Sequence, residues 1–379
     1  MDIRYMKKAI ALAKRATGRT SPNPLVGAVV VRKGEIVGTG YHHKSGEPHA
    51  EIIALERAGD LSRGAELYVN LEPCNHRGQT PPCTEAIIKA GIKRVFIAIR
   101  DPNPLVNGKG IAKLRENGIE VYEGLLKEEA FKINEIFFKY IHSKLPFVAL
   151  KTAISIDGRI ATKAGESRWI TGEKARRHGH TLRNIHDAIL VGIGTVKRDN
   201  PHLTCRLPGK KVRNPIRIIL DSKLSIDYDA RVFDSYISAP IIIATTNQAP
   251  LHKLEQIQKK AKVLVINEGL QVDLSILLKR LGEMEITSIL VEGGSRINGS
   301  FLAANLADKY YCYISPIIIG GDRAPGAFGG EGIRALTNAS KLMDVSVKHL
   351  GEDLLITGYF KKQHYRSLIT VSRNLELSH

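Results

Sequence analysis

Short apolar runs alternate with segments of helical periodicity along most of this chain, and this pattern restricts its possible folds severely. In the first 125 residues, strand-like runs at 27–31, 67–69 and 95–99 alternate with helical patterns at 49–59 and 83–90. Such alternation predicts a sheet covered by helices, which is an α/β fold. The predicted helices end at glycines, which tolerate the positive φ of a helix C-cap: Gly59, Gly91 and Gly118.

A second series of runs predicts a second domain. A helical pattern at 127–142 precedes Pro146, and a new strand-like run follows at once at 147–151. Further strand-like runs lie at 188–191, 216–220, 241–244, 263–265 and 289–291, with helical patterns at 172–183, 250–261 and 272–282. A chain of 379 residues is longer than a single domain with one hydrophobic core usually is. We therefore expect two α/β domains, at 1–145 and 146–361. The tail at 362–379 shows no clear helical or strand period, and disorder is our hypothesis for it.

Basic residues are in excess, with 56 Lys and Arg against 38 Asp and Glu and a net charge of +18. Residues 1–145 carry 23 basic and 16 acidic side chains, net +7, and the remainder carries +11, so the excess is spread in proportion to length. A dispersed excess fits anionic small substrates, solubility and weak RNA binding equally well. Charge alone therefore identifies no partner.

The sequence also bears on location. The first residues interleave charges with apolar side chains and lack the apolar core of a secretory signal. No run approaches the roughly 18 apolar residues of a membrane span. Four cysteines are too few and too unevenly placed for a disulfide framework. We therefore expect a cytoplasmic protein with no membrane partner, in which Cys205 and Cys312 are buried thiols and the closer pair binds a metal.

His49, Cys74 and Cys83 form the pattern of a zinc site. His49 and Cys83 each open a helical pattern after a proline, and Cys74 follows Pro73, so we expect all three at helix starts, where the helix dipole favours thiolate. One imidazole and two thiolates suit Zn²⁺, and three protein ligands leave a fourth position open for water, as in catalytic sites. We expect one zinc ion per chain.

Glu51 lies two residues from a predicted ligand and is the predicted catalytic residue. Zinc lowers the pKa of its water toward roughly 7, and a carboxylate there can act as general base and then general acid. This pattern resembles the cytidine deaminase superfamily, with one departure: eight residues, not two, separate the cysteines. The alternative is a closed structural zinc site whose fourth ligand is one of three histidines: His42, His43 or His76.

Longer motifs make the resemblance more specific. They are SPNPLVG at 21–27, LEPCNHRGQTPPC at 71–83 and RDPNP at 100–104, within a similarity that runs from about residue 1 to 360. On these motifs the chain resembles the bifunctional deaminase/reductase of riboflavin biosynthesis. The insert at 75–82 supplies donors for a phosphorylated or sugar-bearing substrate, although its composition also fits a polar surface loop.

The resemblance implies a cytidine-deaminase-like three-layer N-terminal domain and a dihydrofolate-reductase-like α/β C-terminal domain. It implies two reactions on a small phosphoribosylamino-pyrimidine: zinc-dependent hydrolytic deamination, then reduction of the ribosyl group to ribityl by NADPH. It also suggests a homo-oligomer. Glycine turns at 191–195 and 291–300 follow strand-like runs and suit phosphate binding, but neither has the Rossmann pattern.

The resemblance assigns contacts in the reductase domain residue by residue. Those to NADPH are Ala153, Trp169, Thr195, Asp199, Gly294, Ser295, Arg296, Ile297, Asn298, Gly299 and Ser300. Those to the substrate are Ser167, Arg183, Leu203, Arg206 and Glu292. Guanidinium groups bind phosphate bidentately, so Arg183 and Arg206 suit a 5′-phosphate. Trp169, the only tryptophan, suits a core position equally well.

Two competing functions use the same zinc site. A tRNA deaminase would use the basic charge but has no use for a second α/β domain with glycine turns or for the long cysteine spacing. A catalytically silent binding module would hold zinc structurally. Metal content and a water-accessible fourth coordination position would identify such a module. We expect the two-step enzyme and no nucleic-acid partner.

Overall fold

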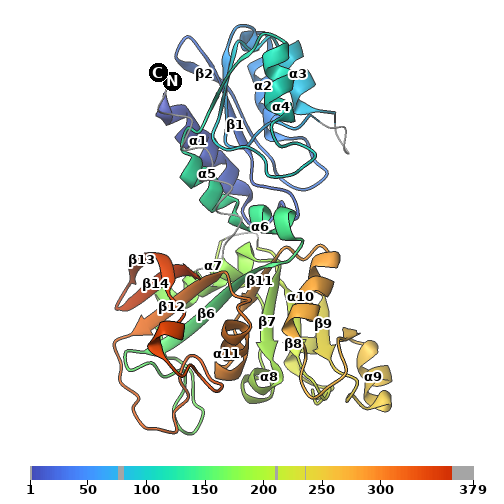
Figure 1. Ribbon diagram of the computed structural model, residues 1–379, viewed down its shortest axis with the longest axis vertical. Coiled ribbons are helices and arrows are strands. Elements are labelled where there is room, and N and C mark those ends of the chain that lie inside the picture. Colours follow the sequence, from blue (N-terminus) through green and yellow to red (C-terminus); the bar gives the residue numbers. More distant parts are fainter. Residues whose placement is uncertain (1, 76–80, 210–211, 235, 361–379) are drawn as a thin grey trace. The chain divides into compact units, whose positions relative to one another are not determined.

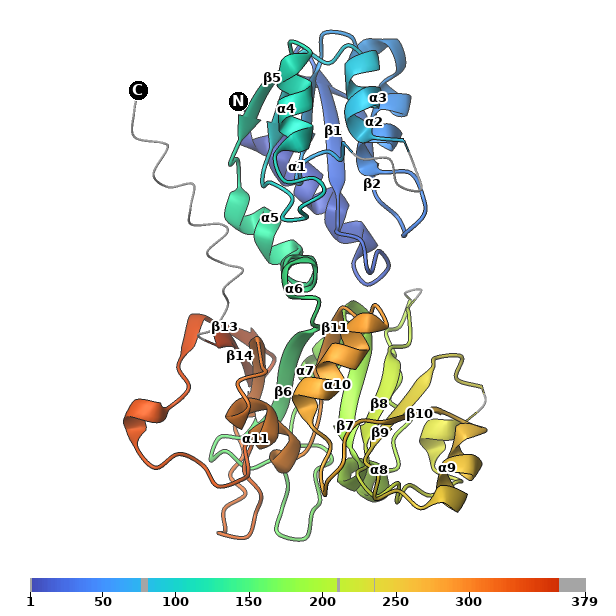
Figure 2. The ribbon, with the colours of Figure 1, turned by 45° about the vertical axis from the view of Figure 1, so that its right-hand side comes forward.

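The computed structural model describes residues 2–75, 81–209, 212–234 and 236–360, which form two compact units that divide between Lys144 and Leu145 (Figures 1 and 2). Two predictions lie outside these ranges: disorder of the tail at 362–379, and substrate contacts from most of the insert, at 76–80. Within these ranges, none of the helices has the length and hydropathy of a membrane span.

The first unit contains a five-stranded sheet with the order β2-β1-β3-β4-β5. Strand β1 is antiparallel to β2 and β3, whereas β3, β4 and β5 are mutually parallel. The strands are β1 (Gly27–Arg32), β2 (Glu35–Tyr41), β3 (Glu66–Val69), β4 (Arg94–Ile97) and β5 (Glu120–Glu123). The helices are α1 (Ile3–Ala13), α2 (Ala50–Ala58), α3 (Cys83–Lys89), α4 (Lys109–Glu116), α5 (Lys127–Ile133) and α6 (Glu135–Ser143), with short 3-10 turns at Lys14–Ala16 and Gly59–Ser62.

Helices cover both faces of this sheet, which gives three layers (Figure 2). Side chains alternate across a strand, so Ala28 and Val30 of β1 pack in the core that holds α2, α3 and α4. On the opposite face, a Cβ at Gly27 would lie 2.1 Å from the Ala9 carbonyl oxygen of α1. On the face covered by α2, a Cβ at Gly40 of β2 would lie 2.2 Å from the carbonyl oxygen of Ala50. Glycine therefore permits the close approach that fixes the start of α2 against the sheet.

The second unit contains a nine-stranded sheet with the order β10-β9-β8-β7-β11-β6-β12-β14-β13. Neighbours from β10 to β12 are parallel, and β14 is antiparallel to both β12 and β13. The strands are β6 (Phe147–Ser155), β7 (Ala188–Gly192), β8 (Ile216–Leu220), β9 (Ile241–Thr245), β10 (Lys262–Val265), β11 (Ser288–Val291), β12 (Lys309–Ser315), β13 (Leu342–Leu350) and β14 (Asp353–Phe360). The helices are α7 (Glu173–Ile185), α8 (Ile193–Asp199), α9 (Leu251–Gln258), α10 (Leu274–Glu283) and α11 (Ser295–Ala303), with 3-10 turns at Arg231–Phe233 and Leu336–Asn338.

Two cores lie on opposite faces of this second sheet. Ala188 and Leu190 of β7 belong to the core that includes α10 and α11, whereas Ile189 and Val191 belong to the core that includes Ile257 of α9. Both faces of the central strands are thus apolar. This explains why these strands appear in the sequence as uninterrupted apolar runs.

The α/β fold class and the predicted apolar strands are confirmed, and Gly59, Gly91 and Gly118 all have positive φ. The predicted helix at 127–142 is instead two helices, α5 and α6, which meet at Asn134. The buried Asn134 side chain accepts from the Leu25 N–H at 2.7 Å and donates to the Leu25 carbonyl at 2.9 Å. These tertiary hydrogen bonds account for a break that periodicity did not indicate.

Candidate active sites

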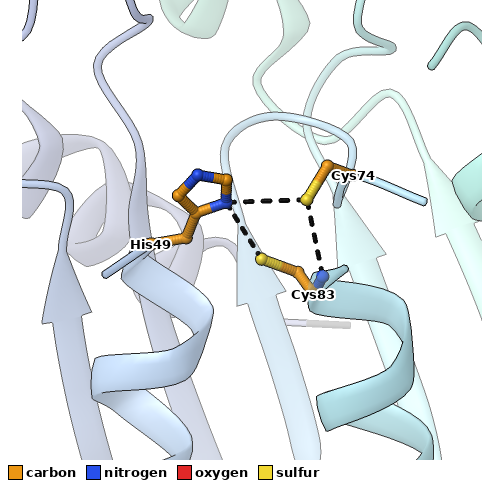
Figure 3. A group of neighbouring side chains, drawn as sticks. All are labelled: His49, Cys74 and Cys83. Carbon is orange, nitrogen blue, oxygen red and sulfur yellow. Dashed lines mark hydrogen bonds between the residues drawn. The ribbon is translucent and has the colours of Figure 1, made fainter. Parts of the chain in front are cut away.

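The structure brings the three predicted metal ligands together in the first unit (Figure 3). His49 is the N-cap of α2 and Cys83 is the first residue of α3. The ligand atoms lie within 4.8 Å of one another, with His49 Nδ1 3.1 Å from Cys83 Sγ and 3.6 Å from Cys74 Sγ. One ring nitrogen and two sulfurs at this spacing are a donor set that fits zinc.

Cys74 departs from the prediction that all three ligands open helices, because it lies in the loop after β3. Its sulfur nevertheless accepts a hydrogen bond, 3.4 Å long, from the first backbone N–H of α3, that of Cys83. Hydrogen bonding between the two thiols lowers the pKa of Cys74 to about 4 and raises that of Cys83. A hydrogen bond to Cys74 also raises the pKa of His49. The cluster therefore favours thiolate at Cys74 even before a metal binds.

Glu51 lies in the first turn of α2 and is only 3% exposed. Burial raises the pKa of Glu51, and its Oε2 atom has no hydrogen-bond partner within the described ranges. Buried carboxylate oxygens normally have a partner, so an unpaired one in the helical turn that follows His49 fits a site that admits water or substrate.

Two of the three histidines considered as a fourth zinc ligand have other partners. His42 contacts the Pro48 carbonyl through Nδ1 and Asn23 through Nε2, both at 3.2 Å. His43 contacts Tyr41, with ring centroids 4.2 Å apart and the ring planes tilted by 40°. Among the described residues neither joins the metal-ligand group, and His76 lies outside them. The geometry described therefore favours an open three-ligand site over a closed one.

The second unit holds a cavity of about 710 Å³. Eleven of the predicted reductase contacts line it: Ala153, Ser167, Trp169, Arg183, Thr195, Asp199, Leu203, Arg206, Glu292, Gly294 and Asn298. Five do not, although they follow Gly294 in α11: Ser295, Arg296, Ile297, Gly299 and Ser300. A Cβ at Gly299 would lie 1.7 Å from the Gly329 carbonyl oxygen, so this part of α11 packs against a neighbouring loop.

Arg183 differs from the expectation of a guanidinium open to phosphate. Its Nε and Nη2 donate to the two carboxylate oxygens of Glu292 at 2.7 and 3.0 Å, and Nη1 donates to the Thr204 carbonyl at 2.9 Å. Lys151 lies 3.6 Å from the same carboxylate. Burial alone would raise the pKa of Glu292, but Arg183 and Lys151 outweigh it and lower the value to about 2.

Arg206 is better placed for an anion, because its only described side-chain hydrogen bond is to the Thr204 hydroxyl at 3.3 Å. Burial lowers the pKa of Arg206, as do the nearby cations Arg183, Arg168 and Arg231. Cations outnumber carboxylates in the cavity lining. The cations are Lys151, Arg168, Arg176, Arg177, Arg183, Arg198, Arg206 and Arg231, and the carboxylates are Glu173, Asp199 and Glu292. This lining fits the phosphates of a dinucleotide and of a sugar phosphate.

Trp169 is 67% exposed, so the alternative that placed it in the core is wrong. The guanidinium carbon of Arg176 lies 4.7 Å from its ring centroid. Cys205 and Cys312 are buried free thiols, as predicted.

Many polar cavity residues were not predicted from the sequence, and three of them contact one another or the proposed substrate residues: Lys151, His180 and Tyr313. Lys151 could have been noticed as a single cation within an apolar run. His180 carries no such signal, and burial together with Arg183 and Arg206 lowers its pKa to about 4. Tyr313 is held by a 2.7 Å hydrogen bond between its hydroxyl and His178 Nδ1.

Two family models match the chain. The cytidine and deoxycytidylate deaminase zinc-binding region matches residues 1–99, which include all three predicted metal ligands. The RibD C-terminal domain matches residues 146–356, which include the cavity.

Whole-length relatives combine both regions. The riboflavin biosynthesis protein RibD of Aquifex aeolicus is 47% identical over 96% of this chain and 99% of the relative, and that of Bacillus amyloliquefaciens is 46% identical over 94% and 96%. Acinetobacter baumannii RibD has a similar structure, with a TM-score of 0.85 at 35% identity, covering 95% of this chain and 99% of that one. A diaminohydroxyphosphoribosylaminopyrimidine deaminase/5-amino-6-(5-phosphoribosylamino)uracil reductase from Thermotoga maritima has a TM-score of 0.84 at 43% identity, with coverage of 94% and 98%.

Proposed function

The chain belongs to the RibD family of riboflavin biosynthesis proteins, and we propose that each of its two domains carries one of the family's two active sites. Residues 1–145 would form the deaminase domain and residues 146–361 the reductase domain. The division of the structure between Lys144 and Leu145 supports this assignment, as do the separate matches of two family models.

The protein is a bifunctional enzyme, a zinc-dependent hydrolase and an NADPH-dependent oxidoreductase. It deaminates 2,5-diamino-6-(5-phosphoribosylamino)pyrimidin-4-one by hydrolysis and then reduces the ribosyl side chain to ribityl. The alternative of a tRNA deaminase with an accessory domain is not supported, because the second half matches a RibD domain and the whole-length relatives are RibD proteins.

His49 Nδ1, Cys74 Sγ and Cys83 Sγ are the proposed zinc ligands. When bound, zinc supplies Lewis acidity, which makes water nucleophilic near neutral pH. The single observation that carries this proposal is the convergence of three ligand atoms at the start of α2, whose first turn also holds Glu51 with its unpaired Oε2.

Glu51 is the proposed proton carrier. Its carboxylate takes up a proton from the attacking water and delivers it to the amino group, which leaves the ring as ammonia. A raised pKa suits both steps, because a group that titrates nearer neutral pH can both accept and release a proton there.

The cavity of the second unit is the proposed NADPH and substrate site. Bound NADPH supplies the hydride, and the protein supplies position and charge. Support for cofactor contacts is strongest for Ala153, Trp169, Thr195, Asp199, Gly294 and Asn298, which line the cavity. Ser295, Arg296, Ile297, Gly299 and Ser300 remain proposals on the family resemblance alone.

Five cavity residues are the proposed substrate contacts: Ser167, Arg183, Leu203, Arg206 and Glu292. We assign the 5′-phosphate to Arg206, because Arg183 is already paired with Glu292. Arg183 would then act by holding the Glu292 carboxylate ionised and oriented toward the substrate.

Three further proposals concern partners and location. The free cysteines support a cytoplasmic protein. The absence of a nucleic-acid partner is supported by the match of the second half to a RibD domain and by the whole-length RibD relatives. A homo-oligomer is supported by edge strand β13, on which Met343, Val345 and Val347 are 41%, 53% and 61% exposed.

The decisive test is an assay of the full-length protein on the phosphoribosylamino-pyrimidine. We expect stoichiometric ammonia release followed by NADPH consumption. Deamination of a tRNA without activity on the pyrimidine would overturn the proposed function.

A further inference from the structure

Glu72 is a buried carboxylate that the proposed chemistry does not use. It lies two residues before Cys74 and is 3% exposed. It accepts four backbone hydrogen bonds: Oε1 from Gly110 and Ile111 at 3.1 and 3.3 Å, and Oε2 from Gly108 and Asp101 at 3.0 and 3.3 Å. Each carboxylate oxygen thus accepts two hydrogen bonds.

These donors come from the start of α4 and from the loop that leads to it. The α4 N-cap is Gly108, which has no side chain to accept from the free N–H groups of the first turn. The Glu72 carboxylate accepts from two of these N–H groups, those of Gly110 and Ile111, although Glu72 lies 38 residues before Gly110 in the sequence. A carboxylate at a helix N-terminus is also favoured by the helix dipole.

The same helix start touches the backbone that carries Cys74. A Cβ at Gly110 would lie 2.1 Å from the Pro73 carbonyl oxygen, so α4 and the Pro73 peptide are in close contact. The Glu72 N–H also donates to the Ile99 carbonyl at 3.0 Å. The residues before Cys74 are therefore attached to α4 and to the segment that follows β4.

On its other side, the Cys74 loop is attached to α3. The Thr84 N–H donates to the Cys74 carbonyl at 3.3 Å, and the Thr84 hydroxyl donates to Asn75 Oδ1 at 2.8 Å. Cys74 is the only proposed zinc ligand outside a helix start, so its position depends on these loop contacts. On the α4 side, these contacts include the four hydrogen bonds of the Glu72 carboxylate.

We propose that Glu72 is a positioning residue for the zinc site, which holds the Cys74 thiolate at the distance that His49 and Cys83 require. This inference rests on the proposed zinc ligands. The proposed role requires a carboxylate at position 72. Gln would keep the size of the side chain but replace one oxygen by an NH₂ group, which would face two N–H donors and accept from neither.

The test compares zinc affinity in full-length wild type, Glu72→Gln and Glu85→Gln. Glu85 is the matched control, because it is exposed and lies two residues after the other cysteine ligand. Zinc affinity is measured by competition with a chromophoric chelator, and the thiolate environment by the absorption bands of the cobalt-substituted protein. We expect Glu72→Gln to weaken zinc binding about 10- to 100-fold and to change the cobalt spectrum, as loss of outer hydrogen bonds to a metal site does.

The reductase provides the internal control for folding. NADPH consumption with the already deaminated substrate should be unchanged in Glu72→Gln, and Glu85→Gln should match wild type in every measurement. Wild-type zinc affinity and cobalt spectrum in Glu72→Gln, with only a lower unfolding temperature, would show that Glu72 merely caps α4 and would overturn the inference.

Two further measurements keep the outcome interpretable. If Glu72→Gln loses reductase activity as well, Glu72→Asp decides: it keeps both oxygens but is one methylene shorter, so intermediate zinc affinity is expected and wild-type affinity would overturn the inference. If wild type binds no zinc, or His49→Ala binds it equally well, the proposed zinc site itself fails.

Discussion

Glu51 and Glu292 are both buried carboxylates, yet their neighbours give them opposite proton affinities. Glu51 has an unpaired oxygen, and burial raises its pKa. Glu292 is held by Arg183 and Lys151, which outweigh burial and lower its pKa to about 2. The first is suited to carry a proton and the second to remain a fixed negative charge.

The proposed role of Glu51 predicts a selective loss. Glu51→Gln should keep bound zinc and the fold, because the size is conserved and Glu51 is not a ligand, but it should reduce ammonia release at least about 100-fold. NADPH oxidation with the deaminated substrate should persist. The measurements are zinc content, ammonia release and NADPH absorbance; ammonia release at the wild-type rate would remove Glu51 from the mechanism.

Arg206 predicts a dependence on the substrate phosphate. Arg206→Met should raise the reductase KM for the phosphorylated substrate about 10- to 100-fold, because a hydrogen bond to a charged group contributes about 1.5–3 kcal/mol. The same variant should match wild type on the dephosphorylated substrate. Arg280→Met, at an exposed position of α10, is the control. An equal effect on both substrates would assign Arg206 a structural role instead.

The Arg183–Glu292 pair predicts a pH-dependent stability. The folded pKa of Glu292, about 2, lies below the unfolded value of about 4.3, so its contribution is complete above about pH 4.3 and is lost as pH falls toward 2. Glu292→Gln should lower the free energy of unfolding by about 3 kcal/mol at pH 7, since Arg183 loses its charged partner. Denaturant unfolding at pH 7, 4 and 3 should show this difference shrinking; a constant difference would contradict the argument.

At the scale of whole elements, helices and strands with strong periodicity could be predicted, and those determined by distant contacts could not. The central strands β7, β8 and β9 are buried on both faces and therefore appear as apolar runs. Strand β13 is exposed over nearly its whole length and gives no such signal. The break at Asn134 depends on hydrogen bonds to Leu25, 109 residues away in the sequence.

The same reasoning separates the two candidate sites. His49, Glu51 and the cysteines follow a local pattern with a chemical meaning, so the sequence alone was enough to propose them. The pairing of Arg183 with Glu292 joins residues 109 positions apart, and no local pattern shows that this arginine already has a partner. Sequence could therefore name cavity residues by resemblance but could not say which cation remains free for phosphate.

Strand β13 carries a prediction of its own. If two copies of the chain associate through this edge, Val345→Lys with Val347→Lys should lower the molecular mass measured by light scattering to that of a monomer, because two charges would enter an apolar contact. Leu251→Lys is the control, since this side chain is 77% exposed on another element. An unchanged mass, or a monomeric wild type, would reject β13 as the interface.

For the molecule as a whole, the proposed assignment gives each reaction to a separate unit with its own core. The first reaction requires a metal and the second requires NADPH. The two are nevertheless linked through the substrate, because the reductase acts on the product of the deaminase. Independence of the sites can therefore be judged only when each reaction receives its own substrate.

Removal of zinc by a chelator provides that test on the full-length protein. Ammonia release should disappear, and NADPH consumption should also disappear when the aminated pyrimidine is supplied, because no deaminated intermediate forms. With the deaminated substrate, NADPH consumption should continue at close to the wild-type rate, since no proposed zinc ligand lies in the second unit. Added zinc should restore ammonia release. Loss of NADPH consumption on the deaminated substrate, restored by zinc, would instead show that the metal site supports both reactions.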